Sequence, residues 1–453
     1  MKQTKTGIFL ISCMLIFSII LTGCAENKSD ADYDNKMTNM VNVVDPTSEE
    51  SYGNTGDVSF ESLTETDYRG YDSKDDNNTE KSEFAQNIGI DKITGQNTDI
   101  DTENNNDTPE ISIIMVGDIL LHTPVAKSGM QEDGSYNFDA VFENVKDEIS
   151  AADLAIVNQE VIIGGEELGI TGYPSFNAPY ELGDALADAG FDVVLHATNH
   201  TLDKGGKGVN NCINFWKSNY PDIAVLGINE SEEEQDNNIY VYEQYGISVA
   251  ILNYTYGTNG IPMPKDMPYA VNLLDEEKVT EDIRKAEELA DLTIVCPHWG
   301  TEYRLTSSAE QERWTDIFLE NGADLVIGTH PHVIEPIEWV SDDNGNEMLV
   351  YYSLGNFVNW TSGTGEGVAN RMVGGMAEVT ICKNEDGEAY ISDYGVEPLV
   401  CHLSEGTNGV TTYLLSDYSQ QLAAENMIIM QDSEFSLEYC ENLCAEVWGE
   451  LFR

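Results

Sequence analysis

The stretch DLVIGTHPH, residues 324 to 332, is the part of the sequence from which the fold can be worked out. Its apolar run from Leu325 to Ile327 is typical of a short buried strand, and His330 and His332 follow it one residue apart. The chain has only seven histidines among 453 residues, so this pair needs an explanation. Strand alternation predicts that the two imidazoles face one side together.

The same pattern, an apolar run followed by polar residues, recurs from residue 111 onward. Strands are expected at 111–117, 153–158, 192–198, 248–254, 292–297, 324–329 and 348–355, and helices at 276–290 and 308–322. Apolar runs that alternate with helical stretches indicate an α/β domain, which we place at residues 109–398. A helical extension is expected at 399–453, with one helix at 411–426 and another around Cys440.

Five of these strands deliver candidate metal ligands to one edge of the predicted sheet, because ligands of open α/β sheets bind beyond the carboxyl ends of the strands. The residues are Asp118, Glu160, Asn199, His200, His298, His330 and His332. Carboxylates, an amide oxygen and imidazoles suit divalent Mn, Fe or Zn, and a bridging carboxylate can hold two ions about 3.5 to 4 Å apart. A single histidine after a strand is more often structural, so the prediction depends on the whole set.

These residues lie in motifs whose order resembles that of a known family. The motifs are Gly-Asp (117–118), Asn-x-Glu (158–160), Thr-Asn-His-x-x-Asp (198–203), Pro-His-Trp-Gly (297–300), Gly-Thr-His-Pro-His (328–332) and Ser-Leu-Gly-Asn-Phe (353–357). In this order they resemble the CapA family of capsule poly-gamma-glutamate synthesis proteins, whose domain belongs to the calcineurin-like metallophosphatase superfamily. The resemblance implies a four-layer α/β/β/α sandwich with a two-metal centre between the sheets.

The resemblance also implies a role for each residue. One ion would be bound by Asp118, Glu160 and His332, and the other by Glu160, Asn199, His298 and His330, with Glu160 as the bridge. His200 would contact the phosphoryl group and protonate a leaving group, while Asp203 would hold His200 in its working tautomer. A water bound to the ions would then attack phosphorus.

The first motif departs from the superfamily pattern, which begins with Asp-x-His. Here Leu120 stands two residues after Asp118, and His122 stands four residues after it. His122 could bend back to supply the missing imidazole, or it could be an ordinary loop histidine. A single ion, or an altered chemistry, is therefore an alternative to the two-metal centre.

Several residues near the motifs have both a functional and a packing interpretation. Trp299, Tyr303 and Phe357 could line a substrate pocket, Arg304 could pair with an anionic group, and Asn356 is expected at the rim of the site by resemblance. Ordinary packing and surface roles are the alternative. His196 and His402 are expected to be structural.

The N-terminal segment predicts export and anchoring. Residues 1–24, MKQTKTGIFLISCMLIFSIILTGC, combine a basic head with a short apolar core, which is the pattern of a secretory signal. The ending Leu-Thr-Gly-Cys resembles a bacterial lipobox, so a lipidated Cys24 is expected to hold the protein on the extracytoplasmic face of the bacterial cell membrane. A plain signal peptide is the alternative. The polar composition of residues 25–108 predicts a disordered acidic linker.

The charge of the chain limits its partners. The formal net charge is −59, of which residues 111–453 carry −45. This argues against nucleic acid and other polyanions held by broad electrostatic attraction, and it favours cations. Poly-gamma-glutamate would be repelled except where a bound metal or a basic patch such as residues 204–207 reverses the local field.

Six further cysteines lie in the predicted domain and its extension: Cys212, Cys296, Cys382, Cys401, Cys440 and Cys444. Their spacing leaves buried thiols and one or two disulfides equally open. For Cys440 and Cys444, one helical turn apart, two thiols on a buried helix face are favoured over a metal site or a disulfide.

Three functions are consistent with the sequence. The first is a lipid-anchored CapA-type protein with a metal site that serves poly-gamma-glutamate capsule or exopolymer synthesis or export, beside polyglutamate synthase subunits or the polymer itself. The second is a phosphoesterase-like metal-dependent hydrolase of an envelope or extracellular substrate. The third is a degenerate sandwich kept as a binding or scaffold module. Metal content, and hydrolysis that depends on His200, would separate them.

Overall fold

The computed structural model describes residues 109–360, 363–404 and 409–452. The predicted signal peptide at 1–24, the lipidation site Cys24 and the acidic linker at 25–108 lie outside the described residues. Among the helices within the described ranges, none is both long enough and apolar enough to cross a membrane.

The first sheet carries the earlier motifs of the chain. Its strand order is β14-β13-β12-β1-β2-β3-β4, and β11 pairs with β1. The bounds are β1 (Glu110–Ile119), β2 (Leu154–Asn158), β3 (Val193–Leu195), β4 (Ala224–Leu226), β11 (Asn356–Val358), β12 (Val373–Lys383), β13 (Ala389–Leu403) and β14 (Val410–Leu414). Strands β1 to β4 are parallel, so their carboxyl ends share one edge.

The second sheet carries the later motifs. Its order is β5-β6-β7-β8-β10-β9, with bounds β5 (Tyr240–Gln244), β6 (Ile247–Thr255), β7 (Leu292–His298), β8 (Leu325–Ile327), β9 (Ile337–Ser341) and β10 (Glu347–Tyr351). Strands β6, β7, β8 and β10 are parallel, whereas the edge strands β5 and β9 are antiparallel to their neighbours. All seven strands expected from the sequence are present.

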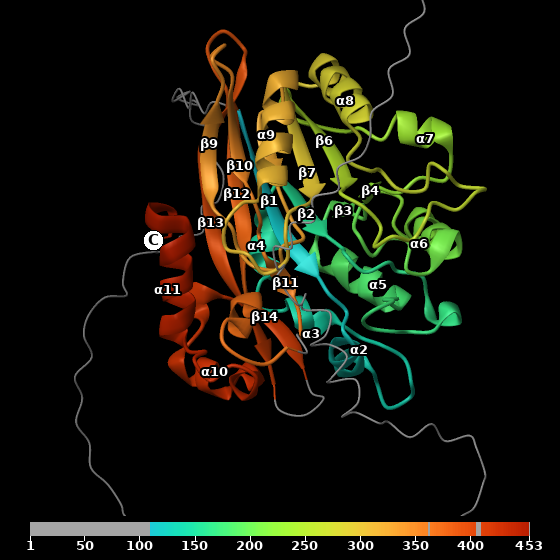
Figure 1. The fold of residues 1–453 in the computed structure, drawn as a ribbon, viewed down its shortest axis with the longest axis vertical. Helices are drawn as coiled ribbons and strands as arrows, with labels where there is room; N and C mark the ends of the chain where they lie inside the picture. The colour runs from blue at the N-terminus through green and yellow to red at the C-terminus, as the bar shows by residue number, and fades with distance from the viewer. Residues whose placement is uncertain (1–108, 361–362, 405–408, 453) are drawn as a thin grey trace, which may run out of the picture. The chain divides into compact units, whose positions relative to one another are not determined.

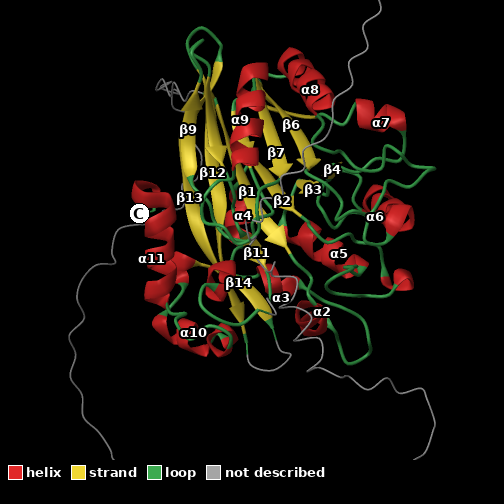
Figure 2. Ribbon diagram, viewed as in Figure 1, coloured by secondary structure: helices red, strands yellow, loops and turns green. Residues whose placement is uncertain are grey.

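Helices connect the strands and cover the sheets (Figures 1 and 2). They are α2 (Thr123–Gly129), α3 (Asp139–Phe142), α4 (Lys146–Ala151), α5 (Tyr180–Ala189), α6 (Gly205–Asn219), α7 (Glu232–Asp236), α8 (Glu276–Leu289), α9 (Ala309–Asn321), α10 (Gln420–Glu425) and α11 (Leu437–Trp448). The two expected helices are α8 and α9. Ser308 and Gln311 form a capping box that starts α9, and Gly322 ends it in the left-handed conformation.

Successive side chains in the second sheet point to opposite faces, and each face packs against a different layer. In β6, Val249 and Ile251 join the apolar cluster shared with the first sheet. Leu252 and Tyr254 point the other way, into the cluster that also holds Ile283 of α8 and Phe318 of α9. The period of two places one face of the sheet against its partner sheet and the other face against helices. The four-layer α/β/β/α sandwich is thereby confirmed.

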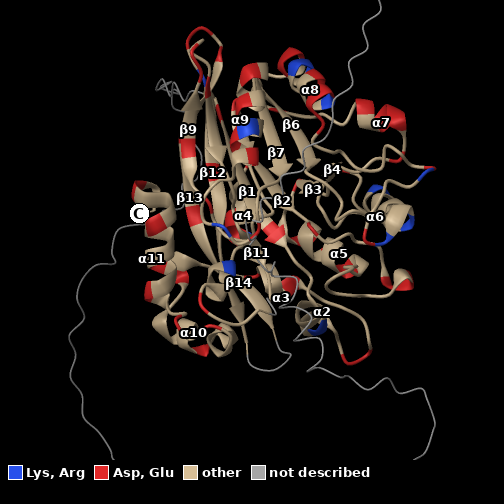
Figure 3. Ribbon diagram, in the orientation of Figure 1, with Lys and Arg blue, Asp and Glu red and all other residues tan. Residues whose placement is uncertain are grey.

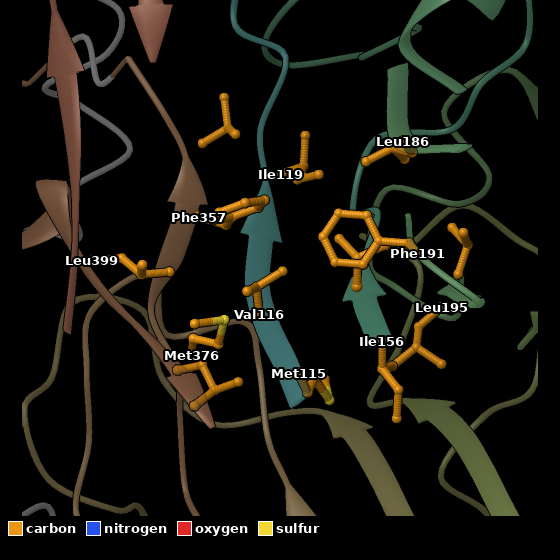
Figure 4. Packing of buried hydrophobic residues seen from close by; sticks show 14 of the residues in the cluster. Met115, Val116, Ile119, Ile156, Leu186, Phe191, Leu195, Phe357, Met376 and Leu399 are labelled. Atoms are coloured by element: carbon orange, nitrogen blue, oxygen red, sulfur yellow. The ribbon is translucent and has the colours of Figure 1, made fainter. Parts of the chain in front are cut away.

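The main core lies around β1 and the strands beside it (Figure 4). Phe357 is 1% exposed and stacks on Phe142 at a ring separation of 5.6 Å. Trp299 is fully buried on the helix side of the second sheet, where it stacks on Phe318. The idea that Trp299 and Phe357 line a substrate pocket is therefore wrong, because both rings serve packing.

The C-terminal segment differs in part from the expectation. Helix α11 is present, but residues 411–426 do not form one helix: β14 occupies 410–414 and α10 only 420–425. Thr411 and Thr412 are β-branched and favour a strand. They hydrogen-bond antiparallel to the edge of β13, whose backbone groups would otherwise lack a neighbouring strand on that side. Strand β13 also runs across the expected boundary at residues 398–399.

The cysteines of the domain and its extension are all buried free thiols. Cys440 and Cys444 lie on the buried face of α11. Acidic residues are spread over the outer helices α7, α8 and α9, in keeping with the charge of the chain (Figure 3).

Candidate metal centre

The candidate ligands meet where the carboxyl ends of the two sheets face each other. Asp118 lies near the end of β1, and His298 is the last residue of β7 in the opposite sheet. The Nδ1 atom of His298 is 3.8 Å from Oδ1 of Asp118, so residues 180 positions apart in sequence touch across the sandwich. Both side chains are fully buried.

Glu160, just after β2, is at the middle of this cluster. Its Oε1 atom lies 3.7 Å from Nε2 of His332 and 3.9 Å from Nε2 of both His298 and His200. Neither carboxylate oxygen has a hydrogen-bond partner within the part of the chain that the structure describes. Burial raises the pKa of Glu160 well above its usual value, and the charge of Asp118 raises it further against the opposing effect of His332.

His332 stands between the two carboxylates. Its Nδ1 atom is 3.0 Å from Oδ2 of Asp118 and 3.1 Å from Oδ1 of Asn356. Burial lowers the pKa of His332, but Glu160 and Asp118 outweigh burial and bring the pKa to about 9. A protonated His332 therefore supplies the positive charge that the carboxylates need in the metal-free protein.

His330 and His332 face the site for a different reason from the one expected. Strand β8 ends at Ile327, and both histidines have positive φ, 102° at His330 and 58° at His332. Strand alternation is thus wrong as the explanation, because a left-handed backbone turns the two rings inward. Positive φ strains a residue with a side chain, and such strain is found mainly at functional sites. The backbone N–H of His330 also donates to Oδ2 of Asp118, at 3.1 Å.

Neighbouring polar groups orient His298. Its Nδ1 atom is 3.0 Å from Oγ1 of Thr329, and its Nε2 atom is 3.0 Å from Oδ1 of Asn199. Asn199 follows β3, so its amide oxygen and the imidazole point at the same space. Burial, followed by the charges of neighbouring histidines, lowers the pKa of His298 and of His330 well below the ordinary value. Both imidazoles are neutral at physiological pH, the form that binds metal ions.

His200 and Asp203 form a separate pair beside the cluster. Nδ1 of His200 is 2.7 Å from Oδ2 of Asp203, and the same Oδ2 accepts the backbone N–H of Phe176 at 2.7 Å. The ring of Phe176 packs edge-on against His200 at 4.7 Å. Asp203 thereby fixes the ring, with Nε2 3.9 Å from Oε1 of Glu160; the roles expected for His200 and Asp203 in catalysis stay predictions.

Three groups of ligand atoms within 4.8 Å of one another occur among residues 109–360, 363–404 and 409–452: Glu160 with His298 and His330, Asp118 with Glu160 and His332, and Glu302 with His330 and His332. The first two groups consist of residues that the resemblance assigns to the two ion positions, and both groups contain Glu160. His122 belongs to none of them. It precedes α2 and packs edge-on against Phe176, and burial with nearby positive groups lowers its pKa to about 3.

Glu302 and Asn158 lie at the site but were not predicted from sequence. Glu302 is an exposed carboxylate two residues after the Pro-His-Trp-Gly motif, and its nearness to that motif could have marked it as a candidate ligand. The amide of Asn158 donates to Oδ1 of Asp118 at 2.8 Å and so holds the carboxylate in place. Asn158 stands in the Asn-x-Glu motif, but a hydrogen bond from one strand to a carboxylate on the next leaves no pattern of its own in sequence.

The residues fit divalent cations. A buried carboxylate with two unpartnered oxygens, neutral imidazoles and an amide oxygen are the donors that Mn, Fe and Zn accept. A buried carboxylate without hydrogen bonds is costly, and a cation at this place would offset that cost. A two-sheet sandwich with these donors at its strand ends defines a protein with a metallophosphatase-like fold and a possible metal site.

Sequence comparison then identifies the family. The model of the family described as bacterial capsule synthesis protein PGA_cap matches residues 112–361, more than half of the chain. The chain belongs to this family. It is 30% identical over 264 residues to the capsule biosynthesis protein CapA of Bacillus anthracis, covering 56% of this chain and 61% of the relative. It is 29% identical over 262 residues to the PGA biosynthesis protein CapA of Bacillus subtilis (strain 168), covering 55% and 64%.

The chain thus aligns with less than two thirds of the length of these two relatives. Among solved structures, NAD nucleotidase of Haemophilus influenzae is similar at 12% identity with a TM-score of 0.41, covering 66% of this chain and 53% of that chain. A putative 5'-nucleotidase from Staphylococcus aureus is similar at 14% identity with a TM-score of 0.38, covering 64% and 54%.

Proposed function

We propose that this protein serves the synthesis or export of poly-gamma-glutamate and that it does so through a dinuclear, hydrolytic metal centre. One observation carries the metal centre: the buried carboxylate of Glu160 has no hydrogen-bond partner among the described residues, yet it stands within 4 Å of three imidazoles. Family membership supports the biological role.

Two ions fit the donor set better than one. Asp118, Glu160 and His332 would hold the first ion, while Glu160, Asn199, His298 and His330 would hold the second. Bound divalent ions supply an activated water and neutralise the negative charge that develops in hydrolysis. Asp118 is itself held by Asn158, so the protein orients its own ligands before any ion arrives.

His200 favours hydrolysis over a scaffold role. Asp203 accepts the Nδ1 proton of His200 at 2.7 Å, which leaves Nε2 toward the centre. With Nε2 protonated as well, His200 can donate that proton to a leaving group, and Asp203 stabilises the imidazolium. A site that only held ions for stability would not need this pair.

The second candidate, a phosphoesterase of another envelope substrate, would use the same residues.

The protein is further proposed to be anchored outside the cell membrane, beside the enzymes that make the polymer. The signal sequence and the lipobox-like ending at Cys24 support a lipid anchor on the extracytoplasmic face of the cell membrane. There the domain would work beside polyglutamate synthase subunits or on the polymer. Lipid labelling in cells tests the anchor: wild type should incorporate labelled fatty acid and Cys24→Ala should not. Equal labelling of both would reject the anchor at Cys24.

The experiment for the centre combines metal analysis with hydrolysis. Full-length protein loaded with Mn²⁺ should hold two ions per chain and hydrolyse either a γ-linked glutamate polymer or an aryl phosphodiester. His200→Asn should keep both ions and lose hydrolysis by about a hundredfold or more, the usual effect of a lost general acid. Asp203→Asn should keep both ions with an intermediate loss. A wild type without bound ions, or a His200 variant of unchanged rate, would contradict the proposal.

A further inference from the structure

The first of the two proposed ion positions has fewer protein donors than the second. It has three, Asp118, Glu160 and His332, whereas the second position has four. Leu120, two residues after Asp118, is a buried apolar residue of the core, and His122 is in none of the ligand groups found among the described residues. Divalent Mn, Fe and Zn take about four to six ligands, so the first position can accept another donor.

A loop from the second sheet brings a carboxylate to the solvent side of the centre. The carboxylate belongs to Glu302, four residues after His298, where β7 ends. Between them Gly300 has a left-handed φ of 95°, which glycine adopts without strain, and the chain turns there. Glu302 is exposed, whereas Asp118 and Glu160 are 0% and 1% exposed. The Glu302 carboxylate therefore lies at the edge of the buried cluster, where its desolvation costs little.

Two backbone hydrogen bonds hold this loop against the segment that carries the histidine pair. The N–H of Trp299 donates to the carbonyl of Thr329 at 3.0 Å. The N–H of Tyr303 donates to the carbonyl of Pro331, between the two histidines, at 2.7 Å. Because these bonds lie on either side of Glu302 in the sequence, they fix its backbone beside the histidine pair. A donor whose backbone is fixed in this way is already in position for an ion.

The Glu302 carboxylate is close to both histidines. One of its oxygens and one ring nitrogen each of His330 and His332 lie within 4.8 Å of one another, the same limit that the two inner groups meet. His330 is 3% exposed, and its Nδ1 atom has no hydrogen-bond partner among the described residues. Buried polar atoms normally have partners, and a bound ion would provide one here. Three donors that divalent metals accept therefore meet at the solvent side of the centre.

The charges at the centre also favour a ligand role for this carboxylate. Burial lowers the pKa of His332, while Glu160, Asp118 and, more weakly, Glu302 raise it. Burial raises the pKa of Glu160, and Asp118 and Glu302 add to the rise against the effect of His332. Three carboxylates that repel one another are thus held together in the metal-free protein. Two divalent ions would bring four positive charges, of which Asp118 and Glu160 balance only two, and a third carboxylate balances one more.

We propose that Glu302 is a further ligand of the metal centre, which binds from the solvent side together with His330 and His332. Asp118 and Glu160 bind from the inner side. Through its nearness to His332, Glu302 adds a fourth protein donor to the ion position that has three. This inference rests on the proposed function only in that the centre binds divalent ions, and it does not depend on what the centre hydrolyses.

The test is Mn²⁺ binding to metal-free, full-length protein, measured by equilibrium dialysis with metal quantitation. Glu302→Gln should keep the fold, because the side chain is exposed, and should weaken the binding of at least one ion about tenfold or more. A loss of this size in Mn²⁺ affinity, with the fold intact, is the expected result.

Glu310→Gln is the matched control. Glu310 is also exposed and belongs to no ligand group within the described residues. Its charge nevertheless reaches the site: burial, then the charges of Glu302 and Glu160, and more weakly that of Glu310, raise the pKa of Tyr256 to about 12. The ring of Tyr256 is 4.7 Å from the ring of His330. Glu310→Gln should bind Mn²⁺ within about threefold of wild type, because a distant exposed charge is screened.

Two further readouts separate ligation from a general effect of charge. Glu302→His replaces the carboxylate with an imidazole, which suits Zn better than Mn. Relative to Glu302→Gln, it should therefore recover Zn²⁺ binding more than Mn²⁺ binding. At saturating Mn²⁺, the electron paramagnetic resonance spectrum of Glu302→Gln should differ from that of wild type, and the spectrum of Glu310→Gln should match it, since only a lost ligand changes the surroundings of the ions.

The possible failures of this inference and of the proposed function are distinct. Wild-type Mn²⁺ affinity and spectrum in Glu302→Gln would overturn the inference and leave the centre standing. Equal losses of affinity in Glu302→Gln and Glu310→Gln would also overturn it, because charge alone would then explain both. Lost hydrolysis with unchanged metal binding in Glu302→Gln would overturn it as well, since Glu302 would then act on the substrate. A wild type without bound ions would instead overturn the proposed centre, and the inference with it.

Discussion

The Glu160 carboxylate should lower the free energy of unfolding of the metal-free protein, but it should be needed for metal binding in the loaded protein. A buried carboxylate without hydrogen bonds destabilises the fold even beside a protonated His332, whereas a bridging carboxylate binds the ions. Glu160→Gln should therefore raise the free energy of unfolding of the metal-free protein by about 1 kcal/mol and abolish the binding of at least one ion. Urea unfolding in chelator, with metal quantitation, measures both. Glu302→Gln changes an exposed carboxylate and should leave the unfolding free energy nearly unchanged. If Glu160→Gln instead lowers the unfolding free energy, the Glu160 carboxylate does not destabilise the metal-free fold.

The pH dependence of metal binding follows from His332. Its pKa of about 9 lies above the ordinary value of 6.5, so its proton stabilises the metal-free fold below pH 6.5 and this stability is lost as pH rises through about 9. Ligation needs the neutral imidazole, so metal affinity should rise across the same window, by up to about tenfold per pH unit for each proton released. Titration in two buffers of different ionisation enthalpy counts the protons. A metal affinity that does not vary with pH would show that metal binding does not release a proton from His332.

At the scale of elements, the close approach of β1 to the turn before β11 positions Asp118. A Cβ on Gly117 would collide with the carbonyl oxygen of Gly355, the same oxygen that accepts the N–H of Asp118 at 3.0 Å. Gly117→Ala should lower the unfolding free energy by about 1 to 3 kcal/mol and weaken metal binding. In Gly395→Ala, on β13, the new Cβ would meet only an ordinary contact, so its stability should be close to wild type. Thermal unfolding and metal titration of both variants give the comparison, and equal stability of the two would reject this account.

Elements with strong apolar patterns could be predicted from sequence, and so could the clustering of the candidate ligands at their ends. The seven expected strands and two helices are present, and Asp118, Glu160, Asn199, His298, His330 and His332 lie together. What the sequence did not provide depends on long-range packing. The left-handed backbone at His330 and the strand β14 are both set by tertiary neighbours, which a local pattern does not record.

At the scale of the whole molecule, the net charge of −45 over residues 111–453 sets the response to salt. Like charges on a compact surface repel one another, and added salt screens them. Raising monovalent salt from about 0.05 to 0.5 M should raise the Tm of the metal-free protein by roughly 2 to 4 °C. Differential scanning calorimetry in chelator measures the shift. A Tm that falls with salt would mean that specific ion pairs outweigh the general repulsion.

In the proposed centre, side chains from two facing sheets bind two cations bridged by Glu160. Anomalous X-ray scattering from crystals of the Mn²⁺-loaded protein tests it most directly. We predict two peaks about 3.5 to 4 Å apart, one beside Asp118 and His332 and the other beside Asn199, His298 and His330. Anomalous density absent from the space around Glu160, in crystals that hold Mn²⁺ elsewhere, would contradict the claim.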